Sequence, residues 1–253
     1  MRAAINHNVL SLHSLAFPKS ISILVLAPHP DDFDVIGVTM RFFQQNENPL
    51  FVAVATSGSK GVEDSFCRPP TPEMKAQIRE QEQKASCRFF GLLEANLMLL
   101  RLQENENGRL LENETNISRV NKLIYRLHPE MVFLPHRNDT NRTHQCVYSI
   151  FQKIARKAKY PLAAFLNRDP KTIQMRYDAY MEFGEKEALW KSKLLRFHRS
   201  QQQRNLKQRG YGMDDRILQM DRESANSCLV EMPYAEVFEL ELYRAKTLAD
   251  ILK

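Results

Sequence analysis

The chain has 253 residues, of which 43% are hydrophobic and 26% are charged. These proportions are those of a soluble globular protein and exclude a disordered or fibrous one, and the length suits one well-buried α/β domain. No window approaches the roughly 18 consecutive apolar residues that a membrane-spanning helix needs, so we expect no transmembrane segment. The formal charge of +6 could favour an anionic substrate, a nucleic acid or an acidic membrane surface.

Predicted strands and helices alternate through the first 160 residues. The apolar runs 21–27 and 51–56 are typical of central strands that are buried on both faces, and residues 33–45 between them have helical character. The order then continues with a helix at 72–90, a strand at 97–102, a helix at 116–127, a strand at 131–135 and a helix at 144–159. This alternation predicts an α/β fold of three layers, with helices on both faces of a mostly parallel sheet.

The last third of the chain has a different pattern. Residues 173–183 alternate apolar and polar side chains, as in a strand with one face in solvent, and a charged helix is predicted at 185–209. A strand at 234–240 and a short final helix are expected to form a small C-terminal extension. We therefore expect an N-terminal extension at 1–19, followed by one compact domain at 20–253.

Cysteine spacing and charge distribution bear on location and partners. The four cysteines lie far apart and lack the paired spacing of zinc or redox motifs, which favours reduced thiols in a cytoplasmic protein. The basic stretch 191–209 carries no aromatic ladder on which bases could stack, so a solvated helix face is the default interpretation. We expect no nucleic-acid binding, because net charge is its only support.

The sequence His-Pro-Asp-Asp at 29–32 follows the first predicted strand, at the edge where open α/β sheets keep their chemistry. His29 and Asp32 are three residues apart at the turn into a helix and could both face a divalent metal, while Asp31 takes a proton from a water on that metal. The alternative is an Asp that caps the helix beginning near Phe33, with Pro30 turning the chain. A cap alone accounts for neither the histidine nor the second carboxylate.

A metal site needs a third protein ligand, and His144 is the best candidate because it follows another strand of the same predicted sheet. Two histidines, one carboxylate and a water form the open tetrahedral arrangement that is typical of a hydrolytic zinc site. The alternative is an ordinary histidine at the start of a helix, and the local context of His144 favours neither reading.

Further motifs accompany these residues along the chain. They are Thr56-Ser57-Gly58, Arg79-x-x-Glu82 with Phe90-Gly91, Asp139-Thr140-Asn141-Arg142-Thr143-His144, His198-Arg199-Ser200-Gln201 and Tyr234-Ala235-Glu236-Val237-Phe238. Together with His-Pro-Asp-Asp, and in this order, they resemble the PIG-L/LmbE family of zinc-dependent N-deacetylases. The resemblance covers roughly residues 20–240.

The resemblance implies a Rossmann-like fold and a metal-dependent hydrolase that removes an acetyl group from a small N-acetylglucosamine-type conjugate. His29, Asp32 and His144 would then bind Zn²⁺, although Fe²⁺ or Mn²⁺ also suits two histidines and a carboxylate. Asp31 would be the general base, and Arg79 would lie near the substrate. The oligomeric state is left open, a homo-oligomer included.

The chain departs from the family pattern in its second motif. Asn141 and Thr143 stand where members usually have the first His and the second Asp of Asp-x-His-x-Asp-His. That histidine is associated with oxyanion stabilisation or proton delivery. Asn141 can take the first role as a hydrogen-bond donor but cannot shuttle a proton. His136 or His198 could supply the proton from elsewhere, although each is better explained as structural.

Two further differences concern the walls of the expected site. An acidic residue of the family is shifted to Asp34, and one glycine of the turn after it is lost, which would alter the wall that faces the sugar. Residues 61–72 form a long loop, either a substrate lid or a surface excursion. Two alternative functions follow from the departures: a metal- or sugar-binding relative that has lost turnover, and a zinc hydrolase that acts on another amide or ester.

Overall fold

The computed structural model describes residues 9–252. Its strands are β1 (Leu10–Ser11), β2 (Ile23–Ala27), β3 (Leu50–Val54), β4 (Leu97–Leu99), β5 (Met131–Pro135), β6 (Leu162–Asn167), β7 (Ala179–Phe183) and β8 (Tyr234–Tyr243). They form one sheet in the order β1-β7-β8-β6-β5-β2-β3-β4. Neighbouring strands pair in parallel except around β8, which is antiparallel to both β6 and β7.

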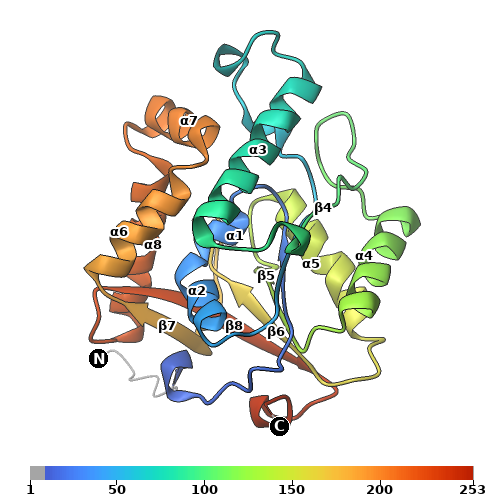
Figure 1. Ribbon diagram of the computed structural model, residues 1–253, viewed down its shortest axis with the longest axis vertical. Helices are drawn as coiled ribbons and strands as arrows, with labels where there is room; N and C mark the ends of the chain where they lie inside the picture. Colours follow the sequence, from blue (N-terminus) through green and yellow to red (C-terminus); the bar gives the residue numbers. More distant parts are fainter. Residues whose placement is uncertain (1–8, 253) are drawn as a thin grey trace.

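Helices cover both faces of this sheet (Figure 1). They are α1 (Asp32–Val35), α2 (Gly37–Gln45), α3 (Pro72–Phe90), α4 (Glu114–Leu127), α5 (Arg142–Ala155), α6 (Glu185–Leu195), α7 (Arg199–Arg209) and α8 (Met213–Cys228). Leu24 and Leu26 of β2 enter the core beneath α4 and α5, whereas Ile23 and Val25 enter the core beneath α2, α3 and α6. The predicted three-layer α/β fold with a mostly parallel sheet is confirmed.

The order of the strands creates a switch point beside β2. From β2 the chain moves outward through β3 and β4 on one side, and then returns to β5 and β6 on the other. Loops that leave the carboxyl ends of β2 and β5 therefore run in opposite directions and leave a crevice between them, where ligands of open α/β sheets bind. The segment at residues 29–32 and the loop before α5 both lie at this crevice.

Helix boundaries follow local capping where the prediction succeeds. The predicted helix 72–90 is α3: the hydroxyl of Thr71 accepts the N–H of Met74 at its start, and Gly91 ends it in the left-handed region with φ of 93°. Asn113 caps α4 through the N–H of Asn116. In each of these contacts the two partners are only a few residues apart in the chain. The helix ends could therefore be predicted from the local sequence.

Two predicted helices are in fact broken. Residues 33–45 form α1 and α2, separated at Ile36, because the carboxylate of Glu236 on β8 accepts the N–H groups of Val38 and Thr39 and starts α2 afresh. Residues 185–209 form α6 and α7, which are separated around His198. The imidazole of His198 is fully buried and pairs with the carboxylate of Asp34, 2.5 Å away.

The predictions for the strands also need correction. Of the alternating stretch 173–183, only Ala179–Phe183 is strand, and β6 and α8 were not predicted at all. The C-terminal strand lies within the sheet, between β6 and β7, rather than beside it. The expected N-terminal extension joins the domain before residue 20, since Leu10–Ser11 pairs with β7 and Leu12 is fully buried. Residues 1–8 of that extension lie outside the described residues.

The basic stretch 191–209 is not simply a solvated face. Lys191 is fully buried, and its ammonium lies 2.6 Å from Asp221 and 2.8 Å from Glu236. The four cysteines are free thiols. Among the described residues, no helix combines the length and the apolar character needed to cross a membrane.

Candidate active site

The turn after β2 holds Asp31 in an unusual backbone conformation. Its φ is 114°, a value that residues with a side chain rarely adopt. The N–H of Asp31 donates to Oε1 of Gln83 at 3.0 Å, and its own side chain makes no helix-capping hydrogen bond. The capping alternative is therefore wrong, and strain at the carboxyl end of a central strand indicates a functional turn.

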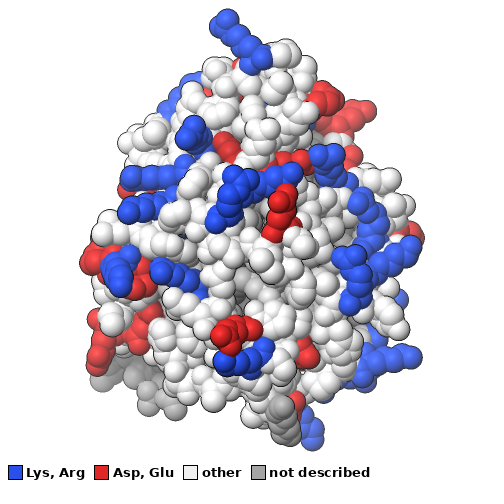
Figure 2. Space-filling model, in the orientation of Figure 1, with Lys and Arg blue, Asp and Glu red and all other residues white. Residues whose placement is uncertain are grey.

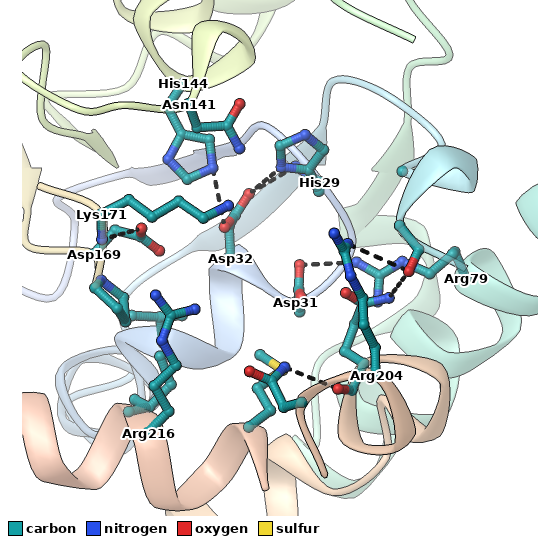
Figure 3. Close-up of a pocket in the computed structure, with 18 of the residues that line it drawn as sticks. His29, Asp31, Asp32, Arg79, Asn141, His144, Asp169, Lys171, Arg204 and Arg216 are labelled. Atoms are coloured by element: carbon teal, nitrogen blue, oxygen red, sulfur yellow. Dashed lines mark hydrogen bonds and ion pairs between the residues drawn. The ribbon is translucent and has the colours of Figure 1, made fainter. Parts of the chain in front are cut away.

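His29, Asp32 and His144 converge in the crevice (Figure 3). The carboxylate of Asp32 lies between the two rings: Oδ2 is 3.2 Å from Nδ1 of His29, and Oδ1 is 3.6 Å from Nε2 of His144. One ligand atom from each residue lies within 4.8 Å of the other two. Around a tetrahedral zinc with bonds of about 2.0–2.2 Å, ligand atoms are separated by roughly 3.3–3.6 Å. The donor set thus fits a divalent cation.

Charges in this cluster are set by burial and by mutual contact. Burial favours the neutral acid of Asp32, but His144 and the hydrogen bonds from His29 hold the pKa of that carboxyl well below its ordinary value. Burial also disfavours protonation of His144, but the carboxylates of Asp32 and Asp139 raise the pKa of His144 to about 9. His144 is therefore protonated at neutral pH, and a cation that used this imidazole as a ligand would have to displace that proton.

Asp139 contacts the ring nitrogen of His144 that points away from Asp32. It is fully buried, its Oδ2 lies 3.1 Å from Nδ1 of His144, and its Oδ1 accepts the N–H of Asn141 at 2.6 Å. A carboxylate on the far nitrogen fixes the orientation of a metal-binding imidazole, with Nε2 toward the metal. The sequence motif contained Asp139, but our sequence analysis assigned it no role. The Asp-x₄-His spacing of Asp139 and His144 is the sequence feature that could have indicated this contact.

Arg79 reaches Asp31 from α3. Its Nη2 donates to Oδ1 of Asp31 at 2.9 Å and to the carbonyl of Pro30, and its Nη1 lies 3.6 Å from Glu82. Gly58 has φ of 63°, and a Cβ there would lie 3.2 Å from Nε of Arg79, so a side chain at this position would strain the backbone and crowd the guanidinium. Arg79 also lines the pocket, and its role toward the substrate stays a prediction.

Asn141 caps α5 and faces the same pocket. Its Oδ1 accepts the N–H of Thr143 at 3.0 Å, which leaves the Nδ2 amide group as a donor. Thr143 itself is buried. Asn141 thus lies beside the three metal-binding candidates, as its place in the motif led us to expect (Figure 3).

The other histidines and the shifted acid lie elsewhere. His198 and Asp34 are fully buried against each other, with Ser86 also donating to Asp34, and neither lines the pocket. His136 is buried against Glu239, 3.1 Å away, and borders a different hollow. The structural explanation of His136 and His198 is therefore supported, and neither histidine lines the pocket in which it could replace the missing proton donor. Asp34, to which the acid of the family pattern is shifted, lies outside the pocket as well.

The pocket around the cluster has a volume of about 350 Å³, within the usual range for small-ligand sites. Its far wall comes from segments that the sequence analysis did not connect with the site: the turn after β6 supplies Asp169 and Lys171, α7 supplies Arg204 and α8 supplies Arg216. Of the loop 61–72 only Gly61 lines the pocket, which favours the surface excursion over the lid.

Comparison with protein families identifies the chain. A family model described as PIG-L, GlcNAc-PI de-N-acetylase, matches residues 24–155, more than half of the sequence. The chain belongs to the PIG-L family. The part that matches the PIG-L model contains His29, Asp31, Asp32, Arg79 and His144, and it ends with α5, before α6, α7 and α8 begin.

Solved structures extend the PIG-L likeness to the whole fold. N,N'-diacetylchitobiose deacetylase from Pyrococcus horikoshii superposes with a TM-score of 0.72 at 16% identity, over 88% of this chain and 84% of that one. The zinc-inhibited form of teicoplanin deacetylase gives a TM-score of 0.63 at 12% identity, over 89% of this chain and 100% of that one.

A third structure with this fold has a different activity. GalB from Pseudomonas putida, a 4-carboxy-2-hydroxymuconate hydratase, gives a TM-score of 0.61 at 17% identity, over 90% of this chain and 98% of that one. A search of curated proteins finds no match. Because the PIG-L fold also carries a hydratase, the reaction has to be argued from the site.

Proposed function

We propose that this protein hydrolyses the acetamide of an N-acetylglucosamine-type conjugate, a small molecule, and releases acetate and a free amine. One observation carries the proposal: the metal-binding candidates His29, Asp32 and His144 converge in a pocket that the carboxylate of Asp31 also lines. Membership of a family of de-N-acetylases supports it.

The three side chains would hold a divalent cation, Zn²⁺ in the first place and Fe²⁺ or Mn²⁺ as alternatives. When bound, such a cation supplies Lewis-acid activation of water and of the acetamide carbonyl. His29, Asp32 and His144 would be its only protein ligands, which is the number that leaves room for water or substrate in catalytic zinc sites. The second-sphere carboxylate of Asp139 keeps the ring of His144 in the orientation that this requires.

Asp31 is placed to move the proton. Arg79 occupies its Oδ1, so Oδ2 is left to accept a proton from the attacking water and to return it to the leaving nitrogen. One carboxylate acting in both directions removes the need for a separate acid, which is consistent with the burial of His136 and His198 away from the pocket.

Asn141 is placed to bind the carbonyl oxygen. Its Nδ2 group is not used in the helix cap and can donate to the oxygen on which negative charge develops. Loss of one such donor typically slows catalysis by about 10²–10³-fold. Asn141 thus takes over the oxyanion role of the family histidine, without its proton chemistry.

The test combines metal content and acetate release on one purified sample, with a panel of N-acetylglucosamine conjugates. Asp31→Asn is the control, because Asn tolerates the left-handed backbone that Asp31 adopts. We expect one metal per chain and acetate release in the wild type, and for Asp31→Asn the same metal content with at least about a 10²-fold lower rate. Turnover that survives Asp31→Asn would refute the mechanism.

The second candidate is a relative that binds metal or sugar without turnover, and the presence of Asn141 in place of histidine favours it. Changing Asn141→His together with Thr143→Asp restores the family motif. A large gain in rate would support this second candidate, whereas a loss of rate would show that the native Asn141 is catalytically competent. The third possibility is a hydrolase of another amide or ester. Rates on aminosugars that carry acyl groups of different length, compared with rates on simple amides, separate it from the first two candidates.

A further inference from the structure

The wall of the pocket that α7 and α8 supply is basic. Arg204 on α7 and Arg216 on α8 reach into the pocket on the side opposite His144 and Asn141 (Figure 3). Arg209 lines the same wall, and no described acidic side chain of either helix does. Figure 2 shows Lys and Arg side chains over the region of α3 and α7, and a further group along the edge near α4.

Both guanidinium groups keep most of their donors uncommitted. Arg204 makes one long hydrogen bond, from Nη1 to the carbonyl of Gly61 at 3.5 Å. Within residues 9–252, the side chain of Arg216 has no hydrogen bond and no ion pair, although it is half-buried and burial lowers its pKa. A guanidinium carries five N–H donors, and removing it from water without an acceptor is unfavourable.

A third arginine, Arg79, also lines the pocket, but its guanidinium is already paired with Asp31 and lies 3.6 Å from Glu82. Arg79 is almost completely buried, and its Nε and Nη1 atoms lack a hydrogen-bond partner among the described residues. By contrast, Arg199 on α7 and Lys193 on α6 are exposed and do not line the pocket. The uncommitted donors of Arg204 and Arg216 thus lie at the wall of the cavity, where an anion would satisfy them.

We propose that Arg204 and Arg216 form a subsite for an anionic group of the substrate, a phosphate or a carboxylate. The subsite rests on the proposed function, because it places the acetamide at the metal end of the pocket and the anion at the α7–α8 wall. Arginine binds both anions through paired N–H···O contacts. Both arginines lie beyond residue 155, outside the part of the chain that matches the family model. They would set the substrate preference of this chain.

The test uses three substrates that share the acetamido sugar. They are N-acetylglucosamine 1-phosphate, the carboxymethyl glycoside of N-acetylglucosamine and its neutral methyl glycoside. We expect kcat/KM for one of the two anionic substrates to exceed that for the neutral one by roughly 10- to 100-fold, the range for hydrogen bonds to charged groups. Which anion is preferred distinguishes phosphate from carboxylate. Equal kcat/KM values for all three substrates would overturn the subsite.

Variants then assign the preference to the two arginines. The double variant Arg204→Gln with Arg216→Gln should lower kcat/KM for the preferred anionic substrate at least tenfold more than for the methyl glycoside. The matched control is Arg199→Gln with Lys193→Gln, which removes the same charge from exposed positions and should change the two values equally. If the control reproduces the selective loss, the preference reflects net charge and the subsite is refuted.

Binding measurements keep the subsite testable if no acetate is released. Calorimetric titration of the metal-loaded protein with N-acetylglucosamine 1-phosphate, the carboxymethyl glycoside and the methyl glycoside needs no turnover. Tighter binding of one anionic compound that the Arg204 and Arg216 variant loses would establish the subsite even where the proposed hydrolysis fails. Equal binding of the three compounds, or selectivity that the variant retains, would refute it.

Discussion

The side-chain oxygen of Gln83 accepts the backbone N–H of Asp31 at 3.0 Å, while its amide nitrogen donates to Ser86 at 3.0 Å. Gln83 is fully buried on α3, so this contact ties the turn after β2 to a long helix on one face of the sheet. The φ of 114° at Asp31 is costly in isolation and persists only where the surroundings hold it. Gln83 is one of the groups that hold it.

Gln83→Met should therefore impair the reaction through Asp31. We expect kcat to fall by about tenfold or more with little change in KM or metal content, because a small displacement of a catalytic group is enough. The lost hydrogen bonds should also lower the free energy of unfolding by about 1–3 kcal/mol. The control is Gln77→Met, at an exposed position of the same helix. An unchanged kcat in Gln83→Met would contradict the positioning role.

Metal binding should release a proton near neutral pH. Asp32 and Asp139 raise the pKa of His144 to about 9 in the cation-free protein, so the ring must lose a proton before Nε2 can bind a metal. The apparent affinity should rise by about tenfold per pH unit from pH 7 to 9 and level off above that. Calorimetry at pH 7 in two buffers of different ionisation enthalpy counts the protons. Binding without proton release would show that His144 is not a ligand.

Asp139→Asn should weaken metal binding without removing a ligand. The amide cannot favour the Nδ1–H form of His144 as a carboxylate does, and second-sphere changes of this kind typically cost about 10–100-fold in affinity. Competition with a chromogenic chelator measures the loss, and Asp64→Asn, at an exposed position, is the control. Wild-type affinity in Asp139→Asn would mean that the ring of His144 is held by other contacts.

Lys191→Met should be among the most destabilising substitutions in the chain. It leaves the carboxylates of Asp221 and Glu236 buried without their shared cation, and breaking a buried pair in this way costs about 3–5 kcal/mol. Lys193→Met on the same helix is exposed and should stay within about 0.5 kcal/mol of the wild type. Urea unfolding of the two variants tests the difference. Equal midpoints would mean that the carboxylates find other partners.

The sequence was sufficient for the parts of the site that local rules govern. His29 and Asp32 follow a continuous apolar run, and His144 follows a second one, so the edge of the sheet at which they meet could be inferred. The ends of α3 could be placed because Thr71 and Gly91 act on their own neighbours.

Contacts between residues far apart in the chain explain the features of the fold that were not predicted from the sequence. The break between α6 and α7 depends on His198 meeting Asp34, 164 residues away, and the break before α2 depends on Glu236, almost 200 residues away. Arg204 looked like part of a solvated run because no local signal distinguishes an arginine that faces a pocket from one that faces water. β6 was missed although residues 162–166 form a continuous apolar run, because the strand follows the predicted helix 144–159 closely and was not separated from it.

The position of β8 has a consequence for biosynthesis. Because Tyr234–Tyr243 is inserted between β6 and β7, the two parts of the sheet stay separate until residues 234–243 have emerged from the ribosome. Glu236 on the same strand fixes the start of α2, just after the turn that carries Asp31, so the turn at residues 29–32 acquires its final surroundings only when β8 is in place. Completion of the sheet therefore waits for β8, and chains truncated just before residue 234 should remain sensitive to protease.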